Sequence, residues 1–283
     1  MILENSNGVN IGCHVTISEG IQNAPKIASD SGCEVVQIFT RSPQGGKSTE
    51  LTPALIQEFK LQVKNYKLKA TYIHTPYYIN LASSNNRIRY GSSKAIRDEL
   101  ERADNLGAKY VMTHLGSAKD MGEKEGIKKT IEMLQKSLEG YTGKTKLLLE
   151  NSAGAGMIIG ADLKEFAEII KETKSPAIAG ICLDTQHSFA SGYDWTNFEK
   201  TIKQIDEELG LGLIKLIHAN DSQSDCGSHK DRHEHIGKGK IGLEAFENIV
   251  KFAKENDIDM LCETPWPGVK EDIKILKSFR DKD

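Results

Sequence analysis

Leu147-Leu148-Leu149-Glu150 is a short apolar run that ends in a side chain able to bind a metal ion. Five more runs end in the same way: Tyr72-Ile73-His74, Val111-Met112-Thr113-His114, Ile181-Cys182-Leu183-Asp184, Leu216-Ile217-His218 and Met260-Leu261-Cys262-Glu263. The last residues of successive runs are 40, 36, 34, 34 and 45 positions apart, which leaves room for a loop, a helix and the next strand. Side chains at equivalent strand ends converge in space, so the repetition predicts one shared site at the mouth of a barrel.

Strand and helix patterns alternate eight times along the 283 residues. We expect strands near Val9–Val15, Glu34–Thr40, Lys69–His74, Tyr110–His114, Lys146–Glu150, Ala179–Asp184, Leu213–His218 and Asp259–Glu263. The stretches between them, such as Pro53–Lys67 and Leu243–Lys254, have apolar residues three and four apart, which is typical of helices with one buried face. Eight such units without a Pro/Gly-rich linker predict one (β/α)8 TIM-barrel catalytic domain over residues 1–283, with an open doubly wound sheet as the structural alternative.

Composition limits the classes of protein that fit. Hydrophobic residues make up 38% and charged residues 27% of the chain, as in globular proteins. No apolar run approaches the roughly 18 residues of a membrane helix, and the first residues lack the pattern of a signal peptide. We therefore expect a cytoplasmic protein without membrane contact, whose five cysteines are mainly buried free thiols. Only Cys226, in a polar loop near histidines, leaves a ligand role open.

The net charge of -3 argues weakly against nucleic acid binding, which usually needs a basic face. Bound divalent cations would reverse that sign locally, because they are often the largest charges in a site. A phosphodiester therefore remains an acceptable substrate for an acidic chain that binds several metal ions.

All eight histidines are expected at strand ends or in the loops that follow them: His14, His74, His114, His187, His218, His229, His233 and His235. The densest cluster is the segment 231–237, where an extended backbone would point Asp231 and His233 to the same side. Asp184 and His187 lie three apart on the turn that leaves a strand, so they can bind one metal or two adjacent metals.

Imidazole and carboxylate ligands together favour zinc, with manganese or iron as alternatives. Five histidines and four carboxylates exceed the needs of one tetrahedral ion. At about three protein ligands per catalytic ion, these nine side chains predict a cluster of two or three metals.

At these residues the chain resembles the endonuclease IV family of apurinic/apyrimidinic endonucleases. The matching segments follow one another through nearly the whole chain: Gly12-Cys13-His14-Val15, Gln37-Ile38-Phe39-Thr40, His74-Thr75-Pro76-Tyr77, Val111-Met112-Thr113-His114-Leu115-Gly116, Leu149-Glu150-Asn151, Cys182-Leu183-Asp184-Thr185-Gln186-His187, His218-Ala219-Asn220-Asp221-Ser222, Asp231-Arg232-His233-Glu234-His235-Ile236-Gly237 and Glu263-Thr264-Pro265. Together they are highly specific.

The resemblance implies three zinc ions per chain, with manganese as an alternative at one site. His74 and His114 would hold the first ion, and Glu150 would bridge it to the second. Asp184, His218 and Glu263 would complete the second site. The third ion would be bound by His187, Asp231 and His233.

The same resemblance implies hydrolysis of the phosphodiester 5′ to an abasic site in double-stranded DNA, leaving a 3′-hydroxyl and a 5′-deoxyribose phosphate. Trimming of blocked 3′ ends is a further activity to expect. Metal ions lower the pKa of bound water to about 7, which supplies a nucleophile at neutral pH. Glu263 would orient or deprotonate this water, and Glu150 would act mainly as the bridge. The enzyme is expected to act as a monomer.

The loop at residues 41–47 departs from the family pattern. Members commonly carry an arginine there that enters the DNA stack, whereas this chain has Gln44 at the nearest matching position, with Arg41 and Lys47 as substitutes. Tyr77 matches a family tyrosine that inserts at the lesion. His235 stands where members often have asparagine, and we expect it to lie outside the metal cluster.

Two other functions stay open at this stage. One is a sugar isomerase or epimerase of the xylose-isomerase type, which shares the barrel and a metal site but generally uses fewer ions. The other is a damaged-DNA binding module without catalysis. The third trio, His187, Asp231 and His233, argues against the first, and the intact ligand set argues against the second.

Overall fold

The computed structural model describes residues 8–46 and 48–282 and contains eight strands that form one closed, parallel barrel. They are β1 (Ile11–His14), β2 (Val35–Ile38), β3 (Ala70–His74), β4 (Tyr110–Thr113), β5 (Lys146–Glu150), β6 (Ile178–Asp184), β7 (Ile214–His218) and β10 (Asp259–Cys262). Their order around the barrel is β1-β10-β7-β6-β5-β4-β3-β2. Every bound lies within two residues of its predicted position. The predicted barrel is confirmed, and the open sheet is excluded.

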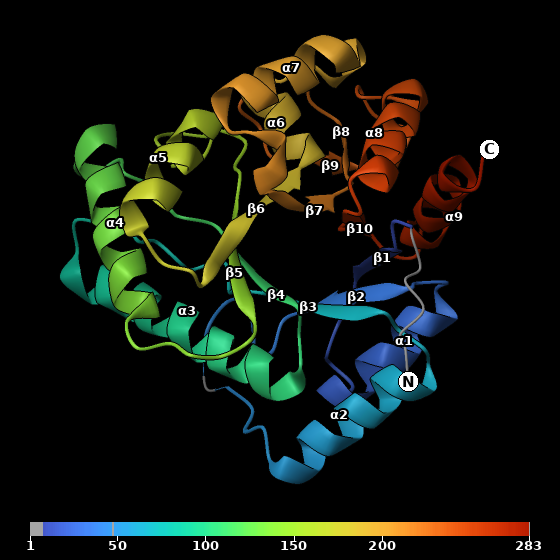
Figure 1. Cartoon of the computed structure of the whole chain (residues 1–283), viewed down its shortest axis with the longest axis horizontal. Helices are drawn as coiled ribbons and strands as arrows, with labels where there is room; N and C mark the ends of the chain where they lie inside the picture. Colours follow the sequence, from blue (N-terminus) through green and yellow to red (C-terminus); the bar gives the residue numbers. More distant parts are fainter. Residues whose placement is uncertain (1–7, 47, 283) are drawn as a thin grey trace.

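Helices surround the strands (Figure 1). They are α1 (Ala24–Asp30), α2 (Pro53–Asn65), α3 (Asn86–Leu106), α4 (Glu123–Leu138), α5 (Leu163–Thr173), α6 (Thr185–Ser191), α7 (Phe198–Glu208), α8 (Leu243–Glu255) and α9 (Val269–Arg280). Helix α2 begins as its sequence predicts, because Thr52 caps it by accepting a hydrogen bond from the backbone N–H of Leu55. Strand β1 pairs with β10, so the first and last strands close the ring.

The inside of the barrel is built in layers, because alternate residues of a strand point to the same face. One layer is apolar and forms its own buried cluster of Val35, Tyr72, Met112, Leu148, Cys182, Leu216 and Leu261. The next layer is polar and consists of the residues two positions after each member of this cluster: Gln37, His74, His114, Glu150, Asp184, His218 and Glu263. A dry core thus supports the polar groups at the C-terminal end of the barrel.

The long connection from β7 to α8 folds over this end. Its two short strands, β8 (Asp221–Ser222) and β9 (His233–Glu234), pair antiparallel. The buried carboxylate of Asp221 accepts backbone hydrogen bonds from Gly237 at 2.9 Å, Gly239 at 3.1 Å and Ile241 at 2.9 Å, which fixes the return of the loop. This arrangement holds His233 over the barrel mouth.

The prediction that every histidine lies at a strand end or in the loop that follows is wrong for His187. This residue is part of the seven-residue helix α6, which starts directly after β6. Asp184 caps the helix by accepting a hydrogen bond from the backbone N–H of His187 at 2.8 Å. A cap this close to a strand end leaves no separate turn, so the predicted turn is replaced by the first turn of a helix.

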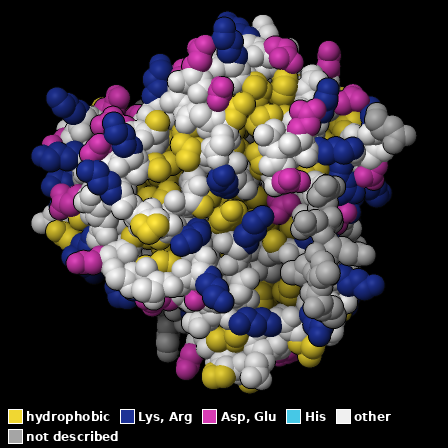
Figure 2. Space-filling view, in the orientation of Figure 1, with side chains coloured by type: hydrophobic (Ala, Val, Ile, Leu, Met, Phe, Trp, Pro, Cys, Tyr) yellow, Lys and Arg dark blue, Asp and Glu magenta, His cyan; other side chains and the backbone are white. Residues whose placement is uncertain are grey.

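Figure 2 shows the face of the molecule that is also seen in Figure 1. Lysine and arginine side chains lie near its middle, and acidic side chains lie mostly around it. No histidine of the described residues is visible there, so the histidine cluster does not open on this face. In the part of the chain that the structure describes, no helix combines the length and the apolar character needed to span a membrane.

We expect Leu148→Ala to destabilise the barrel by about 2–5 kcal/mol, because it leaves a cavity in the closed apolar layer beneath Glu150. Chemical denaturation of the metal-free protein measures this change in the free energy of unfolding. The control is Leu61→Ala on α2, where the leucine is 54% exposed and the expected change is within about 0.5 kcal/mol. Equal effects of the two substitutions would contradict the layered core.

Candidate metal centre

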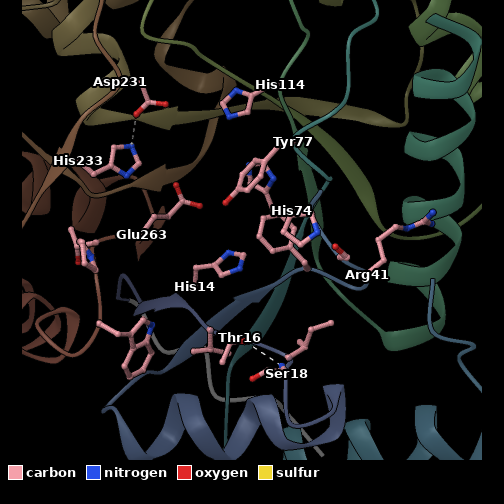
Figure 3. Close-up of a pocket in the computed structure, with 18 of the residues that line it drawn as sticks. His14, Thr16, Ser18, Arg41, His74, Tyr77, His114, Asp231, His233 and Glu263 are labelled. Carbon is pink, nitrogen blue, oxygen red and sulfur yellow. Dashed lines mark hydrogen bonds and ion pairs between the residues drawn. The ribbon is translucent and has the colours of Figure 1, made fainter. Parts of the chain in front are cut away.

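A cavity of about 750 Å³ opens at the C-terminal ends of the strands. Its walls include His74, His114, His187, Asp231, His233 and Glu263. Figure 3 shows His14, His74, Tyr77 and Glu263 directed toward the middle of this cavity, with Asp231 and His233 along one side. Strands far apart in the sequence therefore contribute polar side chains to one space.

Three groups of side chains are suited to metal ions. Within each group, the donor atoms lie within 4.8 Å of one another. The first consists of His74, His114 and Glu150, and the second of Glu150, Asp184, His218 and Glu263. Glu150 belongs to both. Its Oε2 lies 2.7 Å from Nε2 of His74, and its Oε1 lies 2.9 Å from Nδ1 of His218. The two oxygens of one buried carboxylate thus face two different sets of ligands.

The third group contains Asp184, His187 and His233, and Asp231 lies beside it. The Nε2 atoms of His187 and His233 are 3.4 Å apart, and Asp231 oxygens lie 3.4 and 3.5 Å from these two atoms. Two ligands at about 2.05 Å from a tetrahedral zinc ion are about 3.3 Å apart. These spacings exceed those of good hydrogen bonds and fit donors that share one ion.

Charge in the third group is balanced by proton binding when no metal is bound. Burial lowers the pKa of His187, but the negative charges of Asp184 and Asp231 outweigh burial and raise it to about 10. The close approach of His187, together with the surrounding histidines, lowers the pKa of Asp231 to about 2. Protons therefore occupy the positions at which the donor set would accept a cation.

The second group behaves in the same way. Burial alone would raise the pKa of Glu263, but His218, His74 and His233 lower it to about 2. Burial also opposes the charged form of His218, yet Cys182, Glu263 and Glu150 raise its pKa well above the ordinary value. Histidines thus stabilise the charged forms of two of the group's carboxylates, Glu150 and Glu263, as expected of a cation site.

Neutral amides hold these ligands in place, and the sequence did not single them out. Asn220 donates to Oδ2 of Asp184 at 2.7 Å and accepts from the backbone N–H of Glu263 at 2.8 Å. Asn151 exchanges two hydrogen bonds with the backbone of Asp184, at 2.6 and 3.0 Å. Both asparagines follow a strand-end ligand closely in sequence, by one residue after Glu150 and two after His218, which is the signal that could have revealed them.

The described residues that were predicted to contact DNA lie on the rim, but they differ in exposure and in their contacts. Tyr77 is 65% exposed, its ring packs edge-on against Phe39 at 5.2 Å, and its backbone N–H donates to Pro43. Gln44 is exposed in the adjoining loop. Arg41 lines the cavity but pairs with the buried carboxylate of Glu99, which argues against its insertion into DNA (Figure 3). Lys47 lies outside the described residues.

Two further polar residues lie away from the three donor groups. Nδ1 of His235 is 2.7 Å from Oδ2 of Asp272, a buried carboxylate on α9, and His235 is absent from the clusters above. Cys226 is exposed and free, and it joins none of the described donor groups. Neither geometry supports a further metal ligand.

Fold and site together define a class: a (β/α)8 barrel with histidine and carboxylate clusters, suited to metal ions, at the C-terminal ends of its strands. A model of the xylose isomerase-like TIM barrel family matches residues 25–279. Structures such as a D-tagatose 3-epimerase-like protein share the fold, with a TM-score of 0.71 at 20% identity over 96% of this chain and 97% of the other.

Other matches are more specific. A probable endonuclease 4 of Nitrosopumilus maritimus is 38% identical over 280 residues, which is 96% of this chain and 99% of the relative. The crystal structure of endonuclease IV from Thermus thermophilus superimposes with a TM-score of 0.84 and 30% identity, covering 96% of this chain and 97% of that one. The chain therefore belongs to the endonuclease IV family within the xylose isomerase-like TIM barrels.

Zinc binding should release protons. His187, with a pKa of about 10, is protonated at pH 8 in the metal-free protein, whereas a zinc ligand must be the neutral imidazole. Titration calorimetry at pH 8 in buffers of different ionisation enthalpy should detect at least one proton released per chain. Release from His187 should disappear as the pH rises through about 10. No release at pH 8 would contradict the assigned charges.

Proposed function

We propose that this chain is a single-domain, metal-dependent DNA repair endonuclease that hydrolyses the phosphodiester 5′ to an abasic site. The observation that carries this proposal is the shared carboxylate of Glu150, whose two oxygens face His74 and His218 in separate donor groups. A site for one isolated ion needs no such bridge. Paired ions a few ångströms apart are typical of phosphodiester hydrolysis, where attacking and leaving oxygens are stabilised together.

The donors divide among three zinc ions in this proposal, with manganese as an alternative at one. His74 and His114 hold the first with Glu150, which also reaches the second. Asp184, His218 and Glu263 complete the second, and His187, Asp231 and His233 hold the third. The donor spacings described above support this division. All nine donors come from one chain, so the site is complete in a monomer.

When bound, the ions would lower the pKa of a water to make a nucleophile and would neutralise charge on the phosphate. Glu263 is the carboxylate that can orient or deprotonate this water, because its side chain is 17% exposed and lines the cavity. Glu150 has no exposed side-chain surface and cannot reach substrate. Glu150 would therefore hold two ions together, and Glu263 would be the residue in contact with the reaction.

An acidic protein can hold DNA here because the ions would change the sign of the pocket. Four ligand carboxylates against three divalent ions leave about two positive charges where a phosphate would bind. Tyr77 stands exposed at the edge of the same cavity and is placed to stack in the gap left by a missing base. Gln44 and Arg41 adjoin it in the loop whose Pro43 carbonyl accepts from Tyr77.

The sugar epimerase alternative has no specific observation in its favour. The barrel neighbours that act on sugars are 12–20% identical to this chain, so they show the fold alone. The convergence of His187, Asp231 and His233 would serve no purpose in a site for one or two ions. A binding module without catalysis would not need Glu263 at the cavity surface.

Zinc-loaded protein should nick a duplex containing one abasic-site analogue on the 5′ side of the lesion and leave an undamaged duplex intact. Glu263→Gln should lower the rate of nicking by about 100-fold or more, because it removes the group that orients the water. Binding to the same duplex should change little. Gel electrophoresis of end-labelled strands measures both the position and the rate of cleavage.

The matched control is Glu271→Gln on α9. The side chain of Glu271 is 62% exposed and belongs to none of the three donor groups. This variant should nick at the normal rate. Equal cleavage by the Glu263→Gln protein, or no cleavage by wild-type protein with zinc or manganese, would refute the proposal.

Tyr77→Ala should weaken binding to the abasic duplex by roughly 5- to 100-fold, because stacking of one aromatic ring is worth about 1–3 kcal/mol. The fold should be unaffected, since the side chain is mostly exposed. Fluorescence anisotropy with catalytically inactive protein gives the affinity. Tyr90→Ala on α3, which removes another exposed tyrosine, should leave it unchanged. Equal losses in the two variants would argue against a specific role for Tyr77.

A further inference from the structure

Gln37 lies in the polar layer of the barrel but is neither a proposed metal ligand nor in contact with solvent. It is the third residue of β2, on the same strand face as Val35 of the apolar layer below, and its exposure is 0%. Its amide touches three polar side chains from three other strand ends: His14, His218 and Glu263. A buried amide with three such partners has its orientation dictated by their chemistry.

The orientation is set by Glu263. Oε1 of Glu263 is 2.6 Å from Nε2 of Gln37, and an ionised carboxylate only accepts hydrogen bonds, so the amino end of the amide must face it. The second hydrogen of this amino group points to Nδ1 of His14 at 2.9 Å. Reversing the amide would place its carbonyl oxygen against the carboxylate, with two acceptors and no hydrogen between them.

This orientation in turn fixes His218. The carbonyl Oε1 of Gln37 is left facing Nε2 of His218 at 2.8 Å. A carbonyl oxygen only accepts, so Nε2 of His218 must carry the hydrogen. As a metal ligand the imidazole is neutral and has one N–H, and therefore its lone pair would be on Nδ1.

Nδ1 is the nitrogen that faces the second donor group. It lies 2.9 Å from Oε1 of Glu150, 3.3 Å from Oε2 of Glu263 and 3.9 Å from Oδ2 of Asp184. The other ring nitrogen points away into the bond with Gln37. One neutral side chain thus selects the tautomer of a histidine ligand and restrains one oxygen of the carboxylate opposite it.

We propose that Gln37 is a positioning residue of the second metal site, which sets the Nε2–H tautomer of His218 and holds Glu263 so that both present their free donors to the same ion. The inference rests on the metal site of the proposed function, but not on the cleavage of DNA. Hydrogen-bond partners of this kind typically contribute 10- to 100-fold to metal affinity.

The first test is the Gln37→Met protein, which keeps the length of the side chain but removes both its hydrogen-bonding ends. Competition with a chromogenic zinc chelator should show one ion bound about 10- to 100-fold more weakly than in wild type, with the other two unchanged. Gln37→Glu should also weaken that ion, because it places a second carboxylate against Glu263. Gln57→Met, at an exposed position of α2, is the matched control and should bind all ions normally.

A second measurement needs no substitution. Proton-detected nitrogen NMR of histidine side chains in zinc-loaded wild-type protein should show His218 with its hydrogen on Nε2. A hydrogen on Nδ1, or wild-type affinity for every ion in the Gln37→Met protein, would overturn the inference. A loss of thermal stability with unchanged zinc affinity would also overturn it, since that is the result of a purely structural role. Because none of these readouts uses DNA, failure of the proposed endonuclease activity would be seen separately.

Discussion

The barrel mouth depends on the balance between buried carboxylates and the positive charge that must accompany them. Glu150 is 1% exposed and Asp184 is 0% exposed, and both lie within a few ångströms of Glu263. Such groups are strongly destabilising in a protein interior unless cations or protonated bases neutralise them. Histidines from other strands surround them, and the raised pKa values of His187 and His218 indicate that these two supply part of this charge when no metal is bound. Metal ions would take over the same role when they displace the protons.

A buried apolar layer lies directly below this concentration of charge and fixes the strand ends that carry it. Parallel strands expose their C-terminal ends at one rim, and their two-residue period stacks each strand-end ligand above a residue of the apolar layer, as Glu150 stands above Leu148. Amides then restrain the ligands from the side. Asn220 links Asp184 to Glu263, and Gln37 links Glu263 to His218. Most of the donors are therefore held at strand ends, even though they come from distant parts of the chain.

Much of this arrangement could be predicted from the sequence, because apolar runs that end in ligands at steps of 34 to 45 residues leave few alternatives to a barrel. The proximity of the Asp231 and His233 side chains also follows from an extended backbone. The helix that carries His187 was missed, since it begins at a cap immediately after β6 and has only seven residues.

Side-chain contacts between residues far apart in the sequence could not be predicted. The rim role predicted for Arg41 conflicts with its pairing to Glu99, 58 residues away, which no local pattern reveals. Gln37 and Asn220 carry no charge and are not among the metal-binding donors, so their importance is visible only once their partners are in place. Strand periodicity places a side chain in a layer, but it does not determine which neighbours that side chain will meet.

The most direct test of the account is anomalous X-ray scattering from crystals of the zinc-loaded protein. We expect three peaks at the barrel mouth: one next to His74 and His114, one next to His218 and Glu263, and one between His187 and His233, with Glu150 between the first two. Fewer peaks, or ions bound outside these donor groups, would contradict the claim that distant strand ends enclose one shared cluster of cations.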